Sequence, residues 1–168
     1  ANGAYDQGAK LLHWWRMGDA SSPAADGTND IIFEGFEAEG SELITDGGFN
    51  DSSAWNTSIG NPVIEEGVGK FTSTTNSFII KTGAVPATVA TYKLTYDVVT
   101  TNGNTLSLAG GSSAFPTQSI PSSLGTHTVF VTSNGTATSL QFNNSASFIG
   151  SIDNASLKQV RGQYIGPA

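Results

Sequence analysis

The side chains that could carry out acid–base chemistry are few, and their spacing does not suit catalysis. Glu65 and Glu66 form the only pair of adjacent acids in the sequence. Neighbouring strand residues point to opposite faces of a sheet, so these carboxylates could not flank one glycosidic bond, and we expect a solvated edge or turn. The histidines are His13 and His127, and His127 shares a strand face with two valines, as a packed or rim residue does. Since the motifs G-x-S-x-G and H-E-x-x-H and the P-loop are absent, the sequence predicts a protein that is not an enzyme.

The composition restricts the classes of partner. Of 168 residues 12% are charged, and seven bases against fourteen acids give a net charge of −7, which disfavours binding to a phosphate backbone. The chain has no Cys, which excludes disulfides, thiolate zinc sites and a Cys nucleophile. No stretch approaches the ~18 apolar residues of a membrane span. We therefore expect neither nucleic acid nor a membrane as a partner.

The elements that must position any site are β-strands. Apolar residues at 92, 94, 96 and 98 alternate with mostly polar ones, which is the period of a strand with one buried face. Similar runs occur at 43–44, 63–64, 68–71, 78–81, 105–108, 126–132, 139–142, 148–149 and 152–160. Turn signals, such as Asn134-Gly135, separate them. Eight to ten short strands at this spacing predict an all-β, antiparallel β-sandwich or jelly roll.

The charge is distributed unevenly along the chain. Residues 1–42 hold eight acids and two bases, whereas residues 43–168 hold six acids and five bases. This shift predicts an acidic N-terminal arm at 1–41, a sandwich domain at 42–160 and a short C-terminal tail at 161–168.

The arm carries one apolar cluster. An arm of about 40 residues is too short to bury two tryptophans within itself, so the cluster must pack on the following domain or on another chain. Tryptophan and methionine are typical anchors of an interface core. We assign the predicted assembly contact to Leu11, Leu12, Trp14, Trp15 and Met17.

Three segments carry a family resemblance. The run ELITDGGF at 42–49, followed by Trp55, resembles the opening of jelly-roll carbohydrate-binding modules of the fourth and ninth families. The run FIGSIDNASLK at 148–158 is similar to their closing strand, and ATYKLTYDV at 90–98 to their central strand. The resemblance covers 42–160 and implies a galactose-binding-like jelly roll with Phe49, Trp55, Ile152 and Leu157 in the core. Gly47 and Gly48 would supply a tight or positive-φ turn after the first strand.

A second resemblance lies in the arm. The run LHWWRMGD at 12–19 resembles the segment that opens laminin-G-like domains in bacteriophage tail and other virion proteins. Here it precedes the jelly-roll motifs instead of a laminin-G domain. This pairing implies a phage structural protein more than a fragment of a secreted glycosidase.

The carbohydrate-binding family implies a metal site. Related modules often hold a structural calcium between the first and last strands, and calcium takes six to eight oxygen ligands. The matching positions are Glu42, Asp46 and Asp153. The alternative is that Asp46 caps a turn and Asp153 caps the last strand.

The same family implies a sugar site, which needs an exposed aromatic ring with polar groups around it. Trp55 matches a packing tryptophan, and Tyr92 and Tyr96 share their strand face with core residues. The remaining set for a glycan comprises Phe115, Gln118, Gln141 and Tyr164.

Together these observations predict a non-enzymatic structural protein of a bacteriophage virion, either a capsid decoration protein or a tail or fibre component. The jelly roll would be displayed on the particle surface, and the arm would bind other copies or other virion proteins. One alternative is a carbohydrate-binding module that recognises a polysaccharide. Another is an extracellular adhesion or filament subunit of bacteria.

Overall fold

The computed structural model describes residues 38–109, 112–144 and 147–161. These residues form an all-β structure, with one short 3-10 turn, η1 (Ser52–Ala54). The strands are β1 (Ala38–Glu42), β2 (Val63–Glu65), β3 (Val68–Phe71), β4 (Phe78–Lys81), β5 (Thr91–Thr101), β6 (Leu106–Leu108), β7 (Gln118–Ile120), β8 (Gly125–Thr132), β9 (Leu140–Asn143) and β10 (Gly150–Arg161). No helix in this part of the chain is long and apolar enough to cross a membrane. The predicted all-β class is confirmed.

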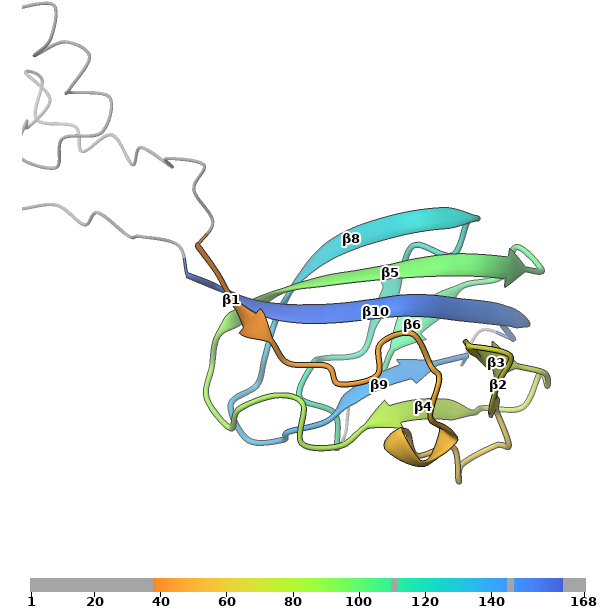
Figure 1. The fold of residues 1–168 in the computed structure, drawn as a ribbon, viewed down its shortest axis with the longest axis horizontal. Coiled ribbons are helices and arrows are strands. Elements are labelled where there is room, and N and C mark those ends of the chain that lie inside the picture. The colour runs from red at the N-terminus through yellow and green to blue at the C-terminus, as the bar shows by residue number, and fades with distance from the viewer. Residues whose placement is uncertain (1–37, 110–111, 145–146, 162–168) are drawn as a thin grey trace, which may run out of the picture. The chain divides into compact units, whose positions relative to one another are not determined.

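The strands form two antiparallel sheets (Figure 1). The first has six strands in the order β2-β3-β10-β5-β8, and β1 also pairs with β10. The second has four strands in the order β4-β9-β6-β7. On one side of β10, β3 pairs with residues 150–152, and β1 pairs further along the same strand. On its other side, β10 pairs with β5 along most of its length.

The core contains side chains from both sheets. In β5 the residues at 92, 94, 96 and 98 are all buried, as their alternation predicts. The ring of Tyr96 meets the ring of Phe142 in β9 at 5.8 Å between centroids, so the two sheets share one core. Phe49 and Trp55 are also buried and stack on each other at 4.5 Å, which confirms their predicted place. These contacts give the molecule a sandwich-like arrangement.

Strand β10 changes the phase of its side chains along its length. Ile152 and Leu157 are both buried although they are five residues apart, and a regular strand would point them to opposite faces. The register with β5 shifts between Asp153 and Ser156, and Asn154 within this bulge has φ 48°. The bulge therefore lets both halves of the strand bury their apolar side chains.

The predicted turn after β1 is present, but neither Gly47 nor Gly48 has a positive φ angle. The positive φ angles belong to Asp46 (62°) and Phe49 (50°). A Cβ atom at Gly47 would overlap the carbonyl oxygen of Ala155. The N–H of Ala155 donates to the Gly47 carbonyl at 2.9 Å, so this turn must approach the bulge of β10 closely.

Two predicted strands are wrong, and two observed strands were not predicted. Residues 43–44 follow β1 and lie outside it, and residues 148–149 form the approach to β10. Strands β1 and β7 were not expected, because AEGSE and QSI lack the β-branched and aromatic alternation of a typical strand. Both depend on neighbouring strands for their conformation.

The domain begins earlier than the charge distribution predicts. Residues 38–41, assigned to the arm, belong to β1, and 39–160 form one compact unit. Glu39, the one acid of this segment, pairs with Lys93 and Lys158 on the sheet, so its charge belongs to the compact unit. The predicted arm anchors at 11–17 lie outside the described residues.

The compact unit is entered and left at one place. Because β1 pairs with β10, the first and last strands lie side by side. In Figure 1 β1 begins and β10 ends at the left side of the sandwich, whereas the β2–β3 hairpin lies at its right side. Both flanking segments therefore connect to the same corner of the unit.

Candidate functional site

The outer face of the six-stranded sheet is the most distinctive exposed surface of the described chain. Along β8 the side chains of Thr126, Thr128, Phe130 and Thr132 are exposed, while the residues between them face the core or its rim. Phe130 is 52% exposed. An aromatic ring at this level of exposure among hydroxyl groups is the kind of residue that contacts a ligand or a partner.

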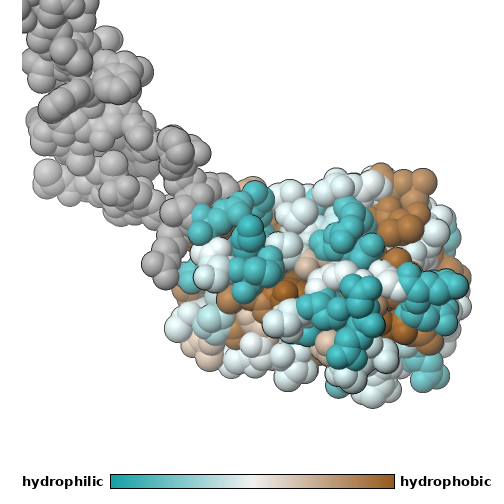
Figure 2. Space-filling model, in the orientation of Figure 1, coloured by the Kyte–Doolittle hydropathy of each residue, from teal (hydrophilic) through white to brown (hydrophobic). Residues whose placement is uncertain are grey.

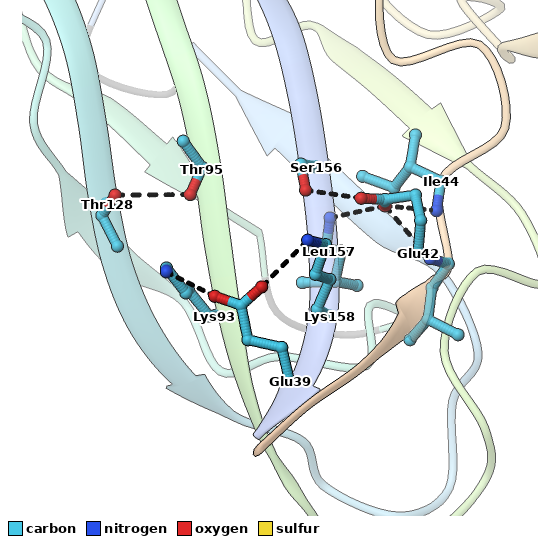
Figure 3. A network of polar contacts seen from close by, with 10 residues as sticks. Glu39, Glu42, Ile44, Lys93, Thr95, Thr128, Ser156, Leu157 and Lys158 are labelled. Carbon is cyan, nitrogen blue, oxygen red and sulfur yellow. Dashed lines mark hydrogen bonds and ion pairs between the residues drawn. The ribbon is translucent and has the colours of Figure 1, made fainter. Parts of the chain in front are cut away.

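Hydroxyl groups pair across the strands of this face. Thr95 in β5 meets Thr128 in β8 at 3.3 Å between their hydroxyl oxygens, as drawn in Figure 3, and a second pair joins the threonines at 91 and 132 at 3.4 Å. At the far end Thr126 donates to the Asp97 carboxylate at 2.5 Å. This bond and one from Asn154 hold the pKa of Asp97 below its ordinary value. The face is therefore polar, with few charges.

One cluster of charges crosses the face. Glu39 in β1 accepts from Lys93 in β5 at 2.6 Å and from Lys158 in β10 at 2.9 Å (Figure 3). These bonds, together with the positive charges of both lysines, lower the pKa of Glu39 to about 2. Because Phe130 pairs with Lys93 in the β5–β8 register, the exposed ring lies next to this cluster.

Glu42 fastens the end of β1 to β10. Its Oε1 accepts from the N–H of Leu157 at 2.9 Å and of Ile44 at 2.9 Å, and its Oε2 accepts from the Ser156 hydroxyl at 2.5 Å (Figure 3). The N–H of Leu43 also donates to Oε1 at 3.0 Å. The carboxylate therefore replaces a strand partner where β10 bulges. We call this arrangement the Glu42 clasp.

The predicted calcium ligands do not come together. The described residues contain no group of three or more His, Cys, Asp or Glu side chains that could hold a metal ion. Glu42 is engaged in the clasp, and Asp46 accepts from the backbone N–H groups of residues 50 and 51 at 2.9 and 3.0 Å. Asp153 accepts from the N–H of the next residue at 2.6 Å. Asp46 and Asp153 therefore cap the backbone of their own segments, whereas Glu42 is bound to β10.

The described members of the predicted sugar-binding set are buried or half-buried. Phe115 is fully buried and meets the ring of Tyr92 edge-on at 5.7 Å, so its assignment to an exposed platform is wrong. Gln141 is buried as well, and Gln118 is half-buried in β7. Tyr164 lies outside the described residues. Phe115 belongs to the hydrophobic core, which its polar sequence context did not indicate.

The acid pair lies at the end of β2 and in the turn after it, consistent with the predicted solvated edge or turn, although its side chains do converge. Glu66 (φ 54°) and Gly67 (φ 72°) form the two-residue turn between β2 and β3. Because Glu66 has left the strand, both carboxylates reach Lys70, at 2.9 Å from Glu65 and 2.6 Å from Glu66. His127 is a rim residue, as expected, and its Nε2 lies 2.6 Å from the Ser123 carbonyl oxygen.

Phe130 is the surface residue that the sequence analysis missed. Its signal was present, because it has the same parity in the strand as Thr128 and Thr132 and the opposite parity to Val129 and Val131. On the side of the compact unit that Figure 2 shows, hydrophilic and neutral residues separate small hydrophobic areas.

Comparison of the chain with protein-family models, with curated proteins and with solved structures gives no significant match. The resemblances in 42–160 and 12–19 therefore remain predictions from the sequence.

Proposed function

We propose that this chain is a non-enzymatic structural protein of a bacteriophage virion, with its sandwich displayed on the particle surface and its N-terminal arm attached to neighbouring subunits. The observation that carries the proposal is the single corner through which the compact unit is entered and left. In this proposal, attachment through that corner presents the opposite end of the unit away from the particle. The Glu42 clasp supports the same arrangement, because it fastens the strand that follows the arm.

The strand order supports a jelly roll within this proposal. β10 lies between β3 and β5, and β9 lies between β4 and β6, so strands far apart in sequence are neighbours in space. A chain that passes repeatedly between two antiparallel sheets is characteristic of Greek-key and jelly-roll sandwiches.

The described carboxylates also support a structural role. Glu39 pairs with two lysines, Glu42 holds backbone N–H groups, and Asp97 binds Thr126 and Asn154. Each of these acids stabilises a strand contact in the same sheet.

The test is an arm variant in the full chain. Trp14→Ala together with Trp15→Ala should leave the circular dichroism spectrum and the urea midpoint of the sandwich unchanged, while incorporation into particles is lost. Leu124→Ala, at an exposed apolar residue of the sandwich, is the control for the loss of apolar surface alone. Particles that carry the double variant at normal occupancy would overturn the proposal.

One observation favours carbohydrate binding as a second candidate function. The exposed ring of Phe130 lies among hydroxyl groups beside Lys93, and sugar recognition combines an aromatic face with a few polar groups. A glycan array with the full chain should then give binding that Phe130→Ala abolishes and Leu124→Ala retains. Equal binding by both variants, or no retained glycan, would eliminate this candidate.

A further inference from the structure

The two sheets have edges that are protected in different ways. An open edge can pair with another chain, and proteins protect edges by short strands, charges and proline. In the six-stranded sheet β2 has three residues and ends at Glu65, which is bound to Lys70 together with Glu66 of the following turn. In the four-stranded sheet β7 has three residues between Pro116 and Pro121, and β4 is bridged by Asn56.

Strand β8 has none of these protections. Its eight residues, GTHTVFVT, include no Lys, Arg, Asp, Glu or Pro. It pairs with β5 from Gly125 to Thr132 in one unbroken register, without a bulge that would twist the edge away. Threonine, valine and phenylalanine all favour extended strands. The longest of these edge strands is therefore also the least protected.

The free hydrogen-bonding groups of β8 can be assigned. The N–H of Ser133 donates to the Ala90 carbonyl at 2.9 Å, so residue 133 directs its backbone toward β5. Hydrogen-bonded and non-bonded pairs alternate along an antiparallel ladder. Residues 126, 128, 130 and 132 therefore direct their N–H and C=O groups outward. Within the described part of the chain, these outward groups have no backbone partner.

We propose that the β8 edge pairs with the β8 edge of a second copy of this chain, antiparallel about a two-fold axis at Val129. The four outward residues are spaced symmetrically about Val129, so the rotation brings donors onto acceptors along the whole strand. Thr126 then faces Thr132 of the second copy, and Thr128 faces Phe130 of the second copy. Four such pairs supply about eight backbone hydrogen bonds and join the two six-stranded sheets into one.

The side chains favour a second copy over other strands. The paired edge has no charged residue, so the net charge of −7 does not bring like charges into opposition at the strand contact. Each Phe130 would cover a threonine of the facing strand, a pairing of aromatic and β-branched residues that stabilises antiparallel strands. Shifting the axis by one residue in either direction leaves part of β8 unpaired or extends the pairing beyond it.

The test uses opposed charges at a predicted pair. In the full chain carrying Trp14→Ala and Trp15→Ala, which removes association through the arm, Thr126→Lys with Thr132→Lys places like charges opposite each other. Thr126→Lys with Thr132→Glu places opposite charges there and matches the first variant in size and position. Both sites are exposed, and the lysine introduced at position 126 can still pair with Asp97.

Sedimentation equilibrium should find a dimer of the arm variant with the natural β8. The dissociation constant of the dimer should be about tenfold higher or more in the Lys/Lys variant than in this parent protein. The Lys/Glu variant should restore dimerisation. A monomeric parent, a Lys/Lys variant that dimerises as tightly as the parent, or two equally monomeric variants would each overturn the pairing. Urea unfolding of all three proteins checks that the sandwich is intact.

Discussion

The Glu42 clasp leads to a stability difference that can be calculated from its contacts. Glu42→Ala removes the acceptor of the N–H groups of Leu157 and Ile44, and the side chains of both residues are buried. The N–H of Leu43 keeps a hydrogen-bond partner in this variant, because it also donates to the Leu157 carbonyl at 2.9 Å. An unpaired buried donor costs about 1–3 kcal/mol. Since water can reach part of this site, we expect Glu42→Ala to lower the free energy of unfolding by about 2–4 kcal/mol.

The matched control is Glu42→Gln. The amide oxygen can still accept from both N–H groups, and the loss of the charge weakens hydrogen bonds that are charge-assisted in the natural protein. We expect this variant to lose about 1 kcal/mol. Urea unfolding of the full chain, monitored by circular dichroism, measures both losses in the free energy of unfolding when the variants share one dependence on urea concentration. Equal losses in the two variants, or a loss below about 1 kcal/mol for alanine, would refute the reasoning.

A second measurement separates a local effect from a global one. In Glu42→Ala the amide hydrogen of Leu157 should exchange faster with solvent than amides paired within the β5–β8 ladder, when both are compared with the natural protein. If all amides accelerate equally, the carboxylate stabilises the whole fold and does not act as a local clasp.

Three further predictions concern the core, the turn after β1 and the charge cluster. Tyr92 and Tyr96 are both buried, but the Tyr92 hydroxyl has no hydrogen-bond partner among the described residues, whereas that of Tyr96 donates to a carbonyl at 2.6 Å. Tyr92→Phe should therefore raise the free energy of unfolding by about 1 kcal/mol and Tyr96→Phe should lower it by about 1 kcal/mol, and changes of the same sign in urea titrations would be inconsistent with this. Gly47→Ala should prevent the turn from approaching β10 and lower the free energy of unfolding by about 3 kcal/mol or more. Gly83→Ala is the control, because a Cβ atom there meets open space and the loss of about 1 kcal/mol would come from its positive φ alone. Similar thermal midpoints for the two variants would contradict the close approach. Glu39 has a lowered pKa, so its contribution to stability is complete above pH 4.5 and is lost as the pH falls toward about 2. Glu39→Gln should therefore reduce the dependence of the free energy of unfolding on pH across that range. An unchanged pH dependence in this variant would argue against the ion pairs.

Local patterns were sufficient to predict the central strands and much of the core. The alternation from 92 to 98 predicted β5 and its buried face, and Phe49 and Trp55 were expected in the core where they stack. These predictions succeeded because a half-buried strand has a period of two whatever its neighbours are. The same rule, applied to Phe130, would have identified the exposed ring.

The missed features depend on residues far apart in sequence. Glu42 contacts Leu157 across 115 positions, and Glu39 contacts Lys158 across 119. The composition of 38–42 therefore resembles an acidic arm, although its acids complete a sheet. Phe115 shows the converse, because its neighbours in sequence are mostly polar although its ring is buried against Tyr92 in the core. Tertiary pairing determined each of these positions, and local sequence does not encode it.

The strand that follows the arm and the proposed β8 contact lie in different parts of one sheet. The clasped strand β1 pairs with β10, and β5 lies between β10 and the free edge β8. Three strand spacings therefore separate the first strand from the β8 edge, a distance of about 14 Å. A second copy at β8 would not displace β1, so the arm and the edge could both be occupied in an assembly. The free energies lost through Trp14→Ala with Trp15→Ala and through Thr126→Lys with Thr132→Lys should then be additive, since distant sites without shared partners act independently. Complete loss of dimerisation between free copies through the arm substitutions alone would instead indicate a single interface.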